Sequence, residues 1–261
     1  MTEITAAFLQ IKNLSKSFQG LMALQDYQLS LAQGELLGII GPNGAGKTTL
    51  FNLVTGFIRP TTGRITFRGE DITNQGPDYI ARLGIARTFQ NIRLFPPLTA
   101  LENVKIGLQI RHPVSLWETL LSVPSFRRNE TVLDGEAGEL LRLVGLDQFR
   151  YMPARNLAYG HQRRLEIACA LATSPQLLLL DEPAAGMNPS ETEDLMSFIV
   201  RVKEQLDLTI ILIEHNMRVI MGICERIQTL NHGRVISEGT PAEVQNDPRV
   251  VEAYLGEPSS N

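Results

Sequence analysis

A glycine-rich loop between an apolar run and a helical run constrains the fold of this chain more than any other feature. The segment GPNGAGKTTL, residues 41–50, matches the pattern G-x-x-x-x-G-K-[ST]. It follows the apolar run ELLGII and precedes a helix-forming run, which is the context that the pattern requires. Glycines there let backbone N–H groups converge on phosphate oxygens, and the helix N-terminus adds its dipole. The sequence therefore predicts a strand, a phosphate-binding loop and a helix, in that order.

Two side chains of this loop have expected roles in nucleotide chemistry. Lys47 would reach the terminal phosphates, and Thr48 would place its hydroxyl on Mg²⁺. An accidental glycine-rich turn is the alternative, and the full pattern with its context argues against it. The residues expected to contact the nucleotide are Gly41, Pro42, Asn43, Gly44, Ala45, Gly46, Lys47, Thr48 and Thr49.

An acidic pair follows a second apolar run, LLLLDEP at residues 177–183. Four apolar residues indicate a buried strand, so Asp181 and Glu182 emerge at its carboxyl end, where ligands bind to parallel sheets. We expect Asp181 to hold Mg²⁺ through water and Glu182 to be the general base that polarises the attacking water. An exposed acidic turn is the other interpretation, and the position of the pair downstream of the phosphate-binding loop favours the catalytic one.

Two more polar residues end predicted strands. His215 closes the run TIILIEH, and we expect it to sense the γ-phosphate, although a histidine at a strand end is usually structural. Gln90 follows a strand in ARTFQN, and its amide would reach Mg²⁺ or the attacking water. The expected catalytic residues are Glu182, His215 and Gln90, and the expected Mg²⁺ ligands are Thr48, Gln90 and Asp181.

The hydrophobic pattern divides the chain into four segments. Residues 1–90 carry alternating strands, the phosphate-binding loop and Gln90, and residues 91–156 form a helical subdomain punctuated by prolines. Residues 157–240 carry continuous apolar strands, which fit a parallel sheet covered on both faces, and residues 241–261 form a helical tail.

Several single elements are also expected. Helices are predicted around 190–206 and within the insertion, at SLWETLLSV and DGEAGELLRLVGL, with Trp117 in the core of the helical subdomain. The segment RIQTLNHGRVISEG predicts a hairpin that turns at Asn231-His232-Gly233.

Composition excludes several classes of protein. The formal net charge of the 261-residue chain is −4 with both signs interspersed, so no basic excess points to nucleic acid. Cys169 and Cys224 have no metal-type spacing and are expected to be buried free thiols. The sequence shows no signal-peptide pattern and no run near the roughly 20 apolar residues of a transmembrane helix. We therefore expect a cytosolic protein, or one attached to a membrane only through a partner.

The stretch RNLAYGHQRRLEIACALA, residues 155–172, has the form of a second anion site. A short turn at residues 158–161 leads directly into a basic, amphipathic helix whose N-terminus favours an anion. Ala158 lacks the hydroxyl that a serine would offer there. Tyr159 should not need positive φ, which is uncommon for a bulky residue.

Together these residues resemble the ATPase subunit of ATP-binding-cassette (ABC) transporters over essentially the whole chain. Phe18 takes the place of the aromatic residue that stacks on adenine, and the remaining positions that carry the resemblance are residues 41–49 for the Walker A loop, Gln90 for the Q-loop, Asp181-Glu182 for the Walker B end, residues 185–188 for the D-loop and His215 for the switch histidine. The implied fold is an α/β P-loop NTPase (RecA-like) core with a mostly parallel sheet, an N-terminal antiparallel β part and an inserted α-helical subdomain. The implied cofactors are ATP and Mg²⁺.

The turn at residues 157–161 is similar to the signature motif of this family, usually Leu-Ser-Gly-Gly-Gln. In the family two ATPase chains pair head to tail, and each ATP lies between one Walker A loop and the signature turn of the other chain. The resemblance therefore implies that Ala158, Tyr159, Gly160 and His161 contact ATP bound to a partner chain. ATP would close the dimer and hydrolysis would open it, and this motion would pass to membrane helices.

The variant LAYG-x-QRRLEIA is similar to that of the ATPase subunits of branched-chain and hydrophobic amino-acid importers, and EPAAGMNPSET, IEHNM and AYLGE agree with it. The implied site of action is peripheral, at the cytoplasmic face of the plasma membrane. The implied partners are a second ATPase subunit that is a non-identical paralogue, two membrane permease subunits and, indirectly, a solute-binding protein. Asn188, where an aspartate is usual, is compatible with such asymmetry.

Residues 91–104 are the expected contact with a membrane subunit. Exposed Leu94, Phe95 and Leu98 on a loop would suit a groove that accepts a coupling helix. Alternatively, these residues only pack the helical subdomain.

Other functions compete with amino-acid import. An ATPase of DNA repair or chromosome structure needs long coiled-coil or zinc insertions between the Walker motifs, and the sequence has none. A translation factor of the family would carry two cassettes in one chain. The ATPase subunit of an exporter for lipid or polysaccharide shares the same chemistry and stays the main alternative.

Overall fold

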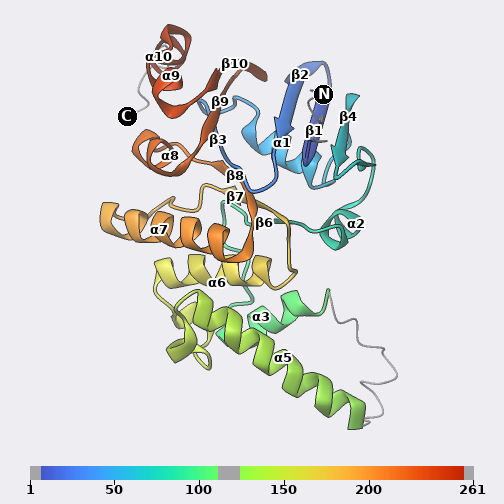
Figure 1. The fold of residues 1–261 in the computed structure, drawn as a ribbon, viewed down its shortest axis with the longest axis vertical. Helices are drawn as coiled ribbons and strands as arrows, with labels where there is room; N and C mark the ends of the chain where they lie inside the picture. Colours follow the sequence, from blue (N-terminus) through green and yellow to red (C-terminus); the bar gives the residue numbers. More distant parts are fainter. Residues whose placement is uncertain (1–6, 111–123, 256–261) are drawn as a thin grey trace, which may run out of the picture.

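A six-stranded sheet forms the centre of the fold (Figure 1). The computed structural model describes residues 7–110 and 124–255. The strands, in spatial order, are β10 (Arg234–Gly239), β9 (Arg226–Asn231), β3 (Leu36–Ile40), β8 (Thr209–Ile213), β7 (Leu177–Asp181) and β6 (Ile85–Arg87). Neighbours are parallel except β10, which forms the predicted hairpin with β9. The predicted, mostly parallel sheet is confirmed.

A second sheet of four antiparallel strands forms the N-terminal part. Its strands, in spatial order, are β2 (Leu21–Leu31), β1 (Leu9–Phe18), β4 (Thr62–Phe67) and β5 (Glu70–Asp71). The hairpin of β1 and β2 turns at Gln19 and Gly20, which have φ of 47° and 91°. Two successive positive φ values are what the tight type I′ hairpin turn requires.

Alternate residues of the central strands enter two separate hydrophobic cores. In β3, Leu36 and Ile40 belong to one core, whereas Leu37 and Ile39 belong to the other. The residues of β7 and β8 divide between the cores in the same way. Successive side chains of a strand point to opposite faces of the sheet. Because both faces are covered, every position is buried, and this accounts for the continuous apolar runs.

Helices cover the two faces of the central sheet. On one face, α1 (Lys47–Val54) shares a core with the four-stranded sheet. The helices of the other core include α6 (Tyr159–Leu171), α7 (Pro189–Leu206) and α8 (Met217–Ile223). Beyond α6, on the side away from the sheet, lie α3 (Ala100–Leu108) and α5 (Pro124–Leu143), as Figure 1 shows.

The remaining elements are short. They are α2 (Pro77–Arg82), α9 (Pro241–Gln245), α10 (Pro248–Leu255) and two 3-10 turns at Asp147–Phe149 and Ala154–Asn156. Both 3-10 turns lie in the connection from α5 to α6.

The start of α7 explains Asn188 in local terms. The Asn188 side chain accepts a hydrogen bond from the Glu191 N–H at 3.0 Å, and the Glu191 carboxylate accepts one from the Asn188 N–H at 3.0 Å. Such a capping box satisfies two backbone donors that the helix itself leaves unpaired, and Pro189 suits the first turn because no N–H is needed there. An amide at position 188 therefore has a structural role within this chain.

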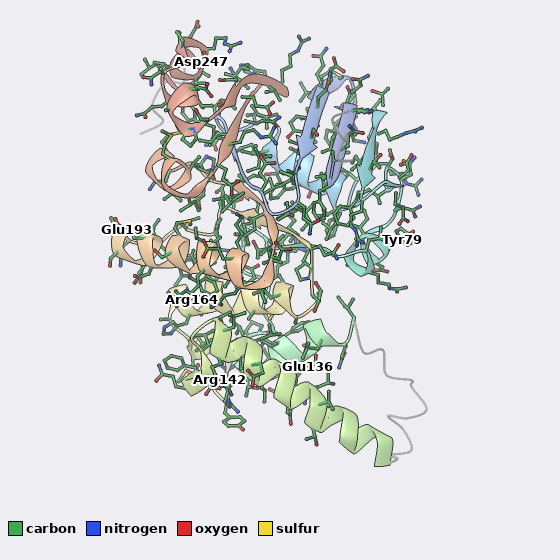
Figure 2. The ribbon with its side chains drawn as sticks, viewed as in Figure 1. Tyr79, Glu136, Arg142, Arg164, Glu193 and Asp247 are labelled. Atoms are coloured by element: carbon green, nitrogen blue, oxygen red, sulfur yellow. The ribbon has the colours of Figure 1, made fainter. Side chains whose placement is uncertain are left out.

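Charged side chains at the surface and free thiols both agree with the sequence prediction. Charged side chains project from outer helices, as Arg142 does on α5 and Glu193 on α7 (Figure 2). Both cysteines are free, as predicted: Cys169 is half-buried and Cys224 is buried, and burial raises the pKa of each thiol to about 12. Within the described residues, no helix combines the length and the apolar character needed to cross a bilayer.

Some helix boundaries differ from expectation. The helix predicted over residues 134–146 begins earlier, at Pro124, and ends at Leu143, two residues before Gly145 with its φ of 75°. Neither α2 nor α8 was predicted, because fewer than eight residues give a weak periodic signal. The predicted helix SLWETLLSV and Trp117 lie outside the described residues. The division of the chain at residues 90, 156 and 240 stays a prediction.

Candidate active site

A cleft at the carboxyl edge of the central sheet gathers most of the predicted site residues. In open α/β sheets this edge is where ligands bind. The loops after β3, β6, β7 and β8 all reach the cleft, and β2 contributes one residue. The lining residues are Ala23, Asn43, Gly44, Ala45, Gly46, Lys47, Thr48, Thr49, Gln90, Glu182 and His215.

Two glycines of the phosphate-binding loop have no room for a side chain. Gly41 has a φ of 147°, and a Cβ there would lie 2.1 Å from the carbonyl oxygen of Leu230 in β9. Gly46 has a φ of 107°, and a Cβ there would lie 2.6 Å from the carbonyl oxygen of Ala23 in β2. Both positions therefore require glycine, for the backbone conformation and for the close approach. Contacts with two neighbouring strands fix the shape of the loop.

Lys47 is buried at the start of α1, and its ammonium group folds back over the loop. Nζ donates hydrogen bonds to the carbonyl oxygens of Gly41 at 2.6 Å and Pro42 at 2.9 Å. These bonds hold a positive charge at the loop, where phosphates are expected to lie. Thr48 lies exposed in the first turn of the same helix and lines the cleft.

The carboxylate of Glu182 lies between the other two predicted catalytic side chains. Nε2 of Gln90 donates to Oε2 at 2.9 Å, and Nε2 of His215 hydrogen-bonds to Oε1. The side chain of Glu182 is 12% exposed, and that of His215 is 41% exposed, so the pair faces the open side of the cleft. Glu182 also has a φ of 49°, a left-handed backbone conformation that is uncommon for a residue other than glycine.

Asp181 is held by a residue that the sequence analysis did not single out. Its Oδ2 accepts a hydrogen bond from Nη2 of Arg87 at 2.7 Å, and both side chains are almost fully buried. Nη1 of Arg87 donates to Oδ1 of Asn52 in α1 at 2.7 Å. A buried carboxylate needs such a partner to offset its desolvation. Because these partners lie 94 and 35 residues away in the chain, no local pattern points to Arg87.

The donor set at the cleft fits Mg²⁺. Hydroxyl, amide and carboxylate oxygens are the ligands that this ion prefers. Thr48 at the start of α1 and Gln90 after β6 line the cleft and supply a hydroxyl and an amide oxygen. Asp181, the last residue of β7, supplies a carboxylate, but this side chain is 3% exposed, is bound to Arg87 and does not line the cleft.

Glu214 is a second residue that was missed. It is 4% exposed, and its carboxylate accepts hydrogen bonds from the N–H groups of Ala184 at 2.9 Å and His215 at 3.2 Å. Burial raises the pKa of Glu214, and these two backbone bonds oppose the rise. Glu214 therefore joins the segment after Glu182 to the histidine of the cleft.

Phe18 lies at the end of β1, beside the β1–β2 turn. Its side chain is 44% exposed, and Nζ of Lys16 lies 4.9 Å from the ring centroid. Among the described residues, the lining of the cleft includes Ala23 from β2 but not Phe18. The ring is thus available at the surface of the four-stranded sheet.

The turn at residues 158–161 forms the N-terminus of α6. Ala158 is the N-cap, and its side chain makes no hydrogen bond to the N–H groups of the first turn. Tyr159 has no positive φ, as predicted, and the ring of His161 stacks on Phe149 with centroids 4.8 Å apart. A Cβ on Gly160 would meet Cε of Met187 at 3.8 Å, an ordinary contact. In the described structure these four residues do not line the cleft.

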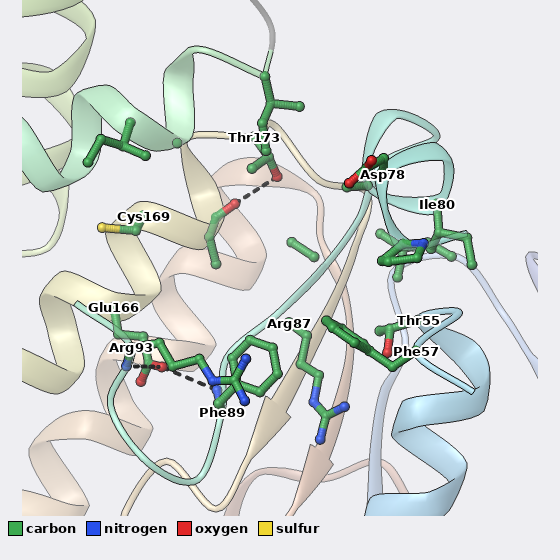
Figure 3. A pocket seen from close by; sticks show the side chains of 18 of the residues that line it. Thr55, Phe57, Asp78, Ile80, Arg87, Phe89, Arg93, Glu166, Cys169 and Thr173 are labelled. Carbon is green, nitrogen blue, oxygen red and sulfur yellow. Dashed lines mark hydrogen bonds between the residues drawn. The ribbon is translucent and has the colours of Figure 1, made fainter. Parts of the chain in front are cut away.

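A separate groove lies between the central sheet, α3 and α6 (Figure 3). Its apolar lining includes Phe57, Phe89, Phe95 and Ile106. Polar residues are also present, namely Asp78, Arg93 and Glu166, and the guanidinium of Arg93 stacks 3.7 Å from the ring centroid of Phe89.

The expected exposure of residues 91–104 is only partly correct. Phe95 is 54% exposed and lines the groove. Leu94 and Leu98 were expected to be exposed, but both are half-buried, and Leu94 packs against the larger hydrophobic core. The sequence pattern did not distinguish the leucine that contacts the core from the exposed phenylalanine next to it.

The fold and the cleft define a P-loop ATPase, and comparison with known proteins specifies its class. Residues 24–185 match the family described as "ABC transporter", and residues 234–259 match "Branched-chain amino acid ATP-binding cassette transporter". The chain belongs to the ATP-binding subunits of ABC transporters, which are ATPases coupled to transport. The predicted fold class and enzyme class are confirmed.

Several relatives match over nearly their whole length. The chain is 44% identical to the high-affinity branched-chain amino acid transport ATP-binding protein LivG of Escherichia coli, over 95% of this chain and 98% of that protein. It is 43% identical to the corresponding protein BraF of Pseudomonas aeruginosa, with the same coverage. The lipopolysaccharide export system ATP-binding protein LptB of Haemophilus influenzae is 35% identical, over 96% of this chain and 98% of that protein.

Solved structures agree with the fold. The ADP conformation of MJ1267, an ATP-binding cassette of an ABC transporter, superposes with a TM-score of 0.84 at 33% identity, over 97% of this chain and 100% of that one. The dimeric cassette MJ0796, bound to ADP and Pi after hydrolysis, superposes with a TM-score of 0.75 at 27% identity, over 89% of this chain and 98% of that one.

Proposed function

We propose that this chain is the ATP-hydrolysing subunit of an importer for branched-chain or other hydrophobic amino acids. The names of LivG and BraF support this substrate class, as does the match of the C-terminal segment to a family of branched-chain amino-acid cassettes. The exporter protein LptB, the relative that supports the alternative of lipid or polysaccharide export, is less similar. The observation that carries the hydrolytic function is the Glu182 carboxylate held between Gln90 and His215, beside the phosphate-binding loop.

The phosphate tail of ATP would lie on the N–H groups of residues 41–49, at the positive end of α1. Lys47 would exchange its bonds to the loop carbonyls for bonds to the terminal phosphates. When bound, Mg²⁺ would neutralise developing charge on the phosphates, held by the oxygens of Thr48, Asp181 and Gln90.

On nucleotide binding, His215 and Gln90 would turn from Glu182 towards the γ-phosphate and the metal side of the site. The proton of the attacking water would then pass to the Glu182 carboxylate, whose oxygens are free of these two bonds. Both contacts with Glu182 come from loops outside β7, so their loss on nucleotide binding leaves the strand intact.

The second phosphate site would act in trans. Ala158, Tyr159, Gly160 and His161 would contact ATP held by the Walker A loop of another ATPase chain, which we propose is a non-identical paralogue. The dimeric state of MJ0796 supports pairing of such cassettes. Gly160 supports it as well: neither φ nor space in this chain requires glycine there, whereas close approach of a phosphate would.

Membrane subunits would dock in the groove of Figure 3. The lining of the groove is largely apolar, and two of its aromatic side chains, Phe57 and Phe95, are 50% and 54% exposed, which is typical of a protein contact. We propose two permease subunits, contacted at the cytoplasmic face of the plasma membrane, and a solute-binding protein that delivers the amino acid to them. Phe18 would stack on the adenine of ATP.

Transport by the assembled complex tests this function. The chain is purified with its native partners and reconstituted into proteoliposomes, and ATP-dependent uptake of labelled leucine is measured. A complex carrying Glu182→Gln in this chain is the matched control and should take up far less. Uptake that does not depend on ATP, or a complex that moves lipid or polysaccharide instead of amino acids, would contradict the proposal.

A further inference from the structure

A buried ion pair on α6 takes no part in the proposed binding or hydrolysis of ATP. Arg163 and Glu166 are 2% and 6% exposed, and their charged groups are 3.1 Å apart. Burying two charges costs free energy unless further hydrogen bonds satisfy them. Nε of Arg163 is nevertheless buried without a hydrogen-bond partner in the described structure, so the pair is not optimised for stability.

The other bonds of this pair go to the backbone around Gln90. Oε1 of Glu166 accepts hydrogen bonds from the N–H groups of Phe89 at 3.2 Å and Arg93 at 3.3 Å. Arg163 donates to the carbonyl oxygen of Phe89 at 2.8 Å and to that of Gln90. The helix therefore holds the main chain on both sides of Gln90 and leaves its side chain in the cleft.

Tyr159 extends the same network to the loop after Glu182. Its hydroxyl accepts a hydrogen bond from Nη2 of Arg163 at 3.1 Å and donates one to the carbonyl oxygen of Ala185 at 2.9 Å. Gly186 lies against the tyrosine ring, where a Cβ would be 3.5 Å from Cε1. One hydroxyl thus joins the start of α6 to residues 185–188.

The network begins at the groove. Phe89, Arg93 and Glu166 line it, and Figure 3 shows Glu166 bonded to the backbone beside Arg93. A continuous path therefore runs from the groove through Glu166, Arg163 and Tyr159 to Ala185. Its bonds to the two loops end on backbone atoms, so neither loop can shift without breaking or moving a bond of the network.

We propose that Glu166, Arg163 and Tyr159 form a relay of positioning residues that moves residues 89–93 and residues 185–188 together when a partner segment occupies the groove. The inference rests on the proposed docking of a membrane subunit there. The relay acts through Gln90 in the cleft of this chain and through the turn at residues 158–161, which contains Tyr159. A segment bound in the groove would thereby change the position of Gln90 and of the turn at residues 158–161 at the same time.

A double-mutant cycle in the assembled complex tests the relay. Glu166→Gln keeps an oxygen for the two backbone N–H groups but turns an amide donor towards the donors of Arg163, so it breaks that link alone. Tyr159→Phe removes the hydroxyl between Arg163 and Ala185. Each change should lower ATP turnover of the complex about tenfold, the effect expected for one charge-assisted hydrogen bond. Because both changes interrupt one path, the ATP turnover of the double variant should be no more than about twofold lower than that of the less active single variant.

Three controls make the result decisive. Glu139→Gln breaks an exposed ion pair with Arg142 on α5 and should change turnover less than about twofold. Thermal melting checks that each variant is folded, and Arg163→Lys, which cannot bridge both carbonyl oxygens, replaces Glu166→Gln if that variant unfolds. Losses that multiply to about a hundredfold in the double variant, or single variants with normal turnover, would overturn the relay.

Assembly separates this inference from the proposed docking. Phe95→Asp places a charge in the groove and should prevent the membrane subunits from copurifying, whereas Glu166→Gln should not. If the Phe95→Asp complex assembles normally, the groove is not the docking site and the proposed function of the groove fails with it. If that complex fails to assemble but the cycle is multiplicative, the docking stands and the relay is wrong.

Discussion

Glu182 at the end of β7 and His215 after β8 hydrogen-bond to each other across the ends of neighbouring strands. The second carboxylate oxygen of Glu182 accepts a hydrogen bond from Gln90. Both oxygens therefore have side-chain partners from other loops before any substrate arrives. These partners hold the carboxylate at the edge of the cleft, where a general base is expected.

Replacing Glu182 with glutamine should separate binding from chemistry. The amide keeps the shape of the side chain but cannot take up a proton, so turnover should fall by about 10²–10⁴-fold while ATP affinity stays nearly unchanged. Steady-state ATPase assays and an ATP titration measure the two effects. Glu193→Gln on the exposed face of α7 is the control. Turnover within about threefold of wild type would remove Glu182 from the role of base.

Lys47→Ala should act on binding. The variant loses the charge that the loop holds over its carbonyl oxygens, and ATP affinity should fall at least about tenfold, equivalent to ~1.4 kcal/mol. A binding titration measures this loss of affinity. Lys12→Ala, at an exposed position of β1, is the control. Unchanged affinity would count against the assignment of the phosphate-binding loop.

Phe18 should make nucleotide binding tolerant of the base. A phenyl ring offers a π-face and no hydrogen bond that reads a base edge, so GTP should bind within about tenfold of ATP, or ~1.4 kcal/mol. Phe18→Ala should weaken both nucleotides alike, as competition titrations would show. A hundredfold preference for ATP would instead demonstrate base contacts elsewhere in the complex.

The turn before α6 should tolerate a hydroxyl but not a charge. Ala158→Ser should change turnover of the assembled complex less than about tenfold, because one neutral hydrogen bond contributes about 0.5–1.5 kcal/mol. Gly160→Asp should be far worse, since it sets a like charge against the γ-phosphate. The site has room for a Cβ within this chain, so the variant is expected to fold and to fail only in the complex. Near-normal activity of Gly160→Asp would show that the turn does not touch phosphate.

Glu214 should make stability depend on pH. Burial raises its pKa in the folded state above the ordinary value of 4.5, so its contribution is most favourable below pH 4.5 and is lost as the pH rises through the folded pKa. Glu214→Gln carries no titrating charge and keeps one oxygen, which can accept from the N–H of Ala184 or of His215 but not from both. The variant loses one hydrogen bond at every pH, so the informative quantity is the difference in Tm between variant and wild type, which should shift in favour of the variant as the pH rises from 4 to 7. Parallel melting curves of the two proteins that stay the same distance apart across this range would contradict the burial effect.

The positions of site residues that a local sequence pattern marks could be predicted. Residues that matter because of contacts with distant parts of the chain could not be predicted. The loop at 41–49, Asp181, Glu182 and His215 each follow an apolar strand, and parallel strands bring their carboxyl ends to one edge. Arg87 and Glu214 carry no such signal. Their importance arises from buried contacts with Asp181, Asn52 and Ala184, which the fold creates.

The burial of side chains in residues 91–104 and in α6 could not be predicted from the sequence. Leu94 and Leu98 are both half-buried, and Leu94 packs against the larger hydrophobic core, a tertiary contact that the composition of a loop does not reveal. Similarly, Arg163 and Glu166 look in the sequence like the polar face of an amphipathic helix, yet both are buried, because the loop at residues 89–93 supplies their partners.

The lack of room at Gly41 affects how nucleotide-binding mutants of this chain are to be judged. A methyl group there would collide with the carbonyl oxygen of Leu230 in β9, so an alanine would displace the strand or the loop whether or not a nucleotide is bound. A null phenotype at this position reports a misassembled sheet as readily as an empty nucleotide site. Gly44 is the better position for testing nucleotide binding, because a Cβ there would meet no described atom within 4 Å. A side chain at Gly44 would be opposed only by the left-handed backbone conformation and by a bound ligand.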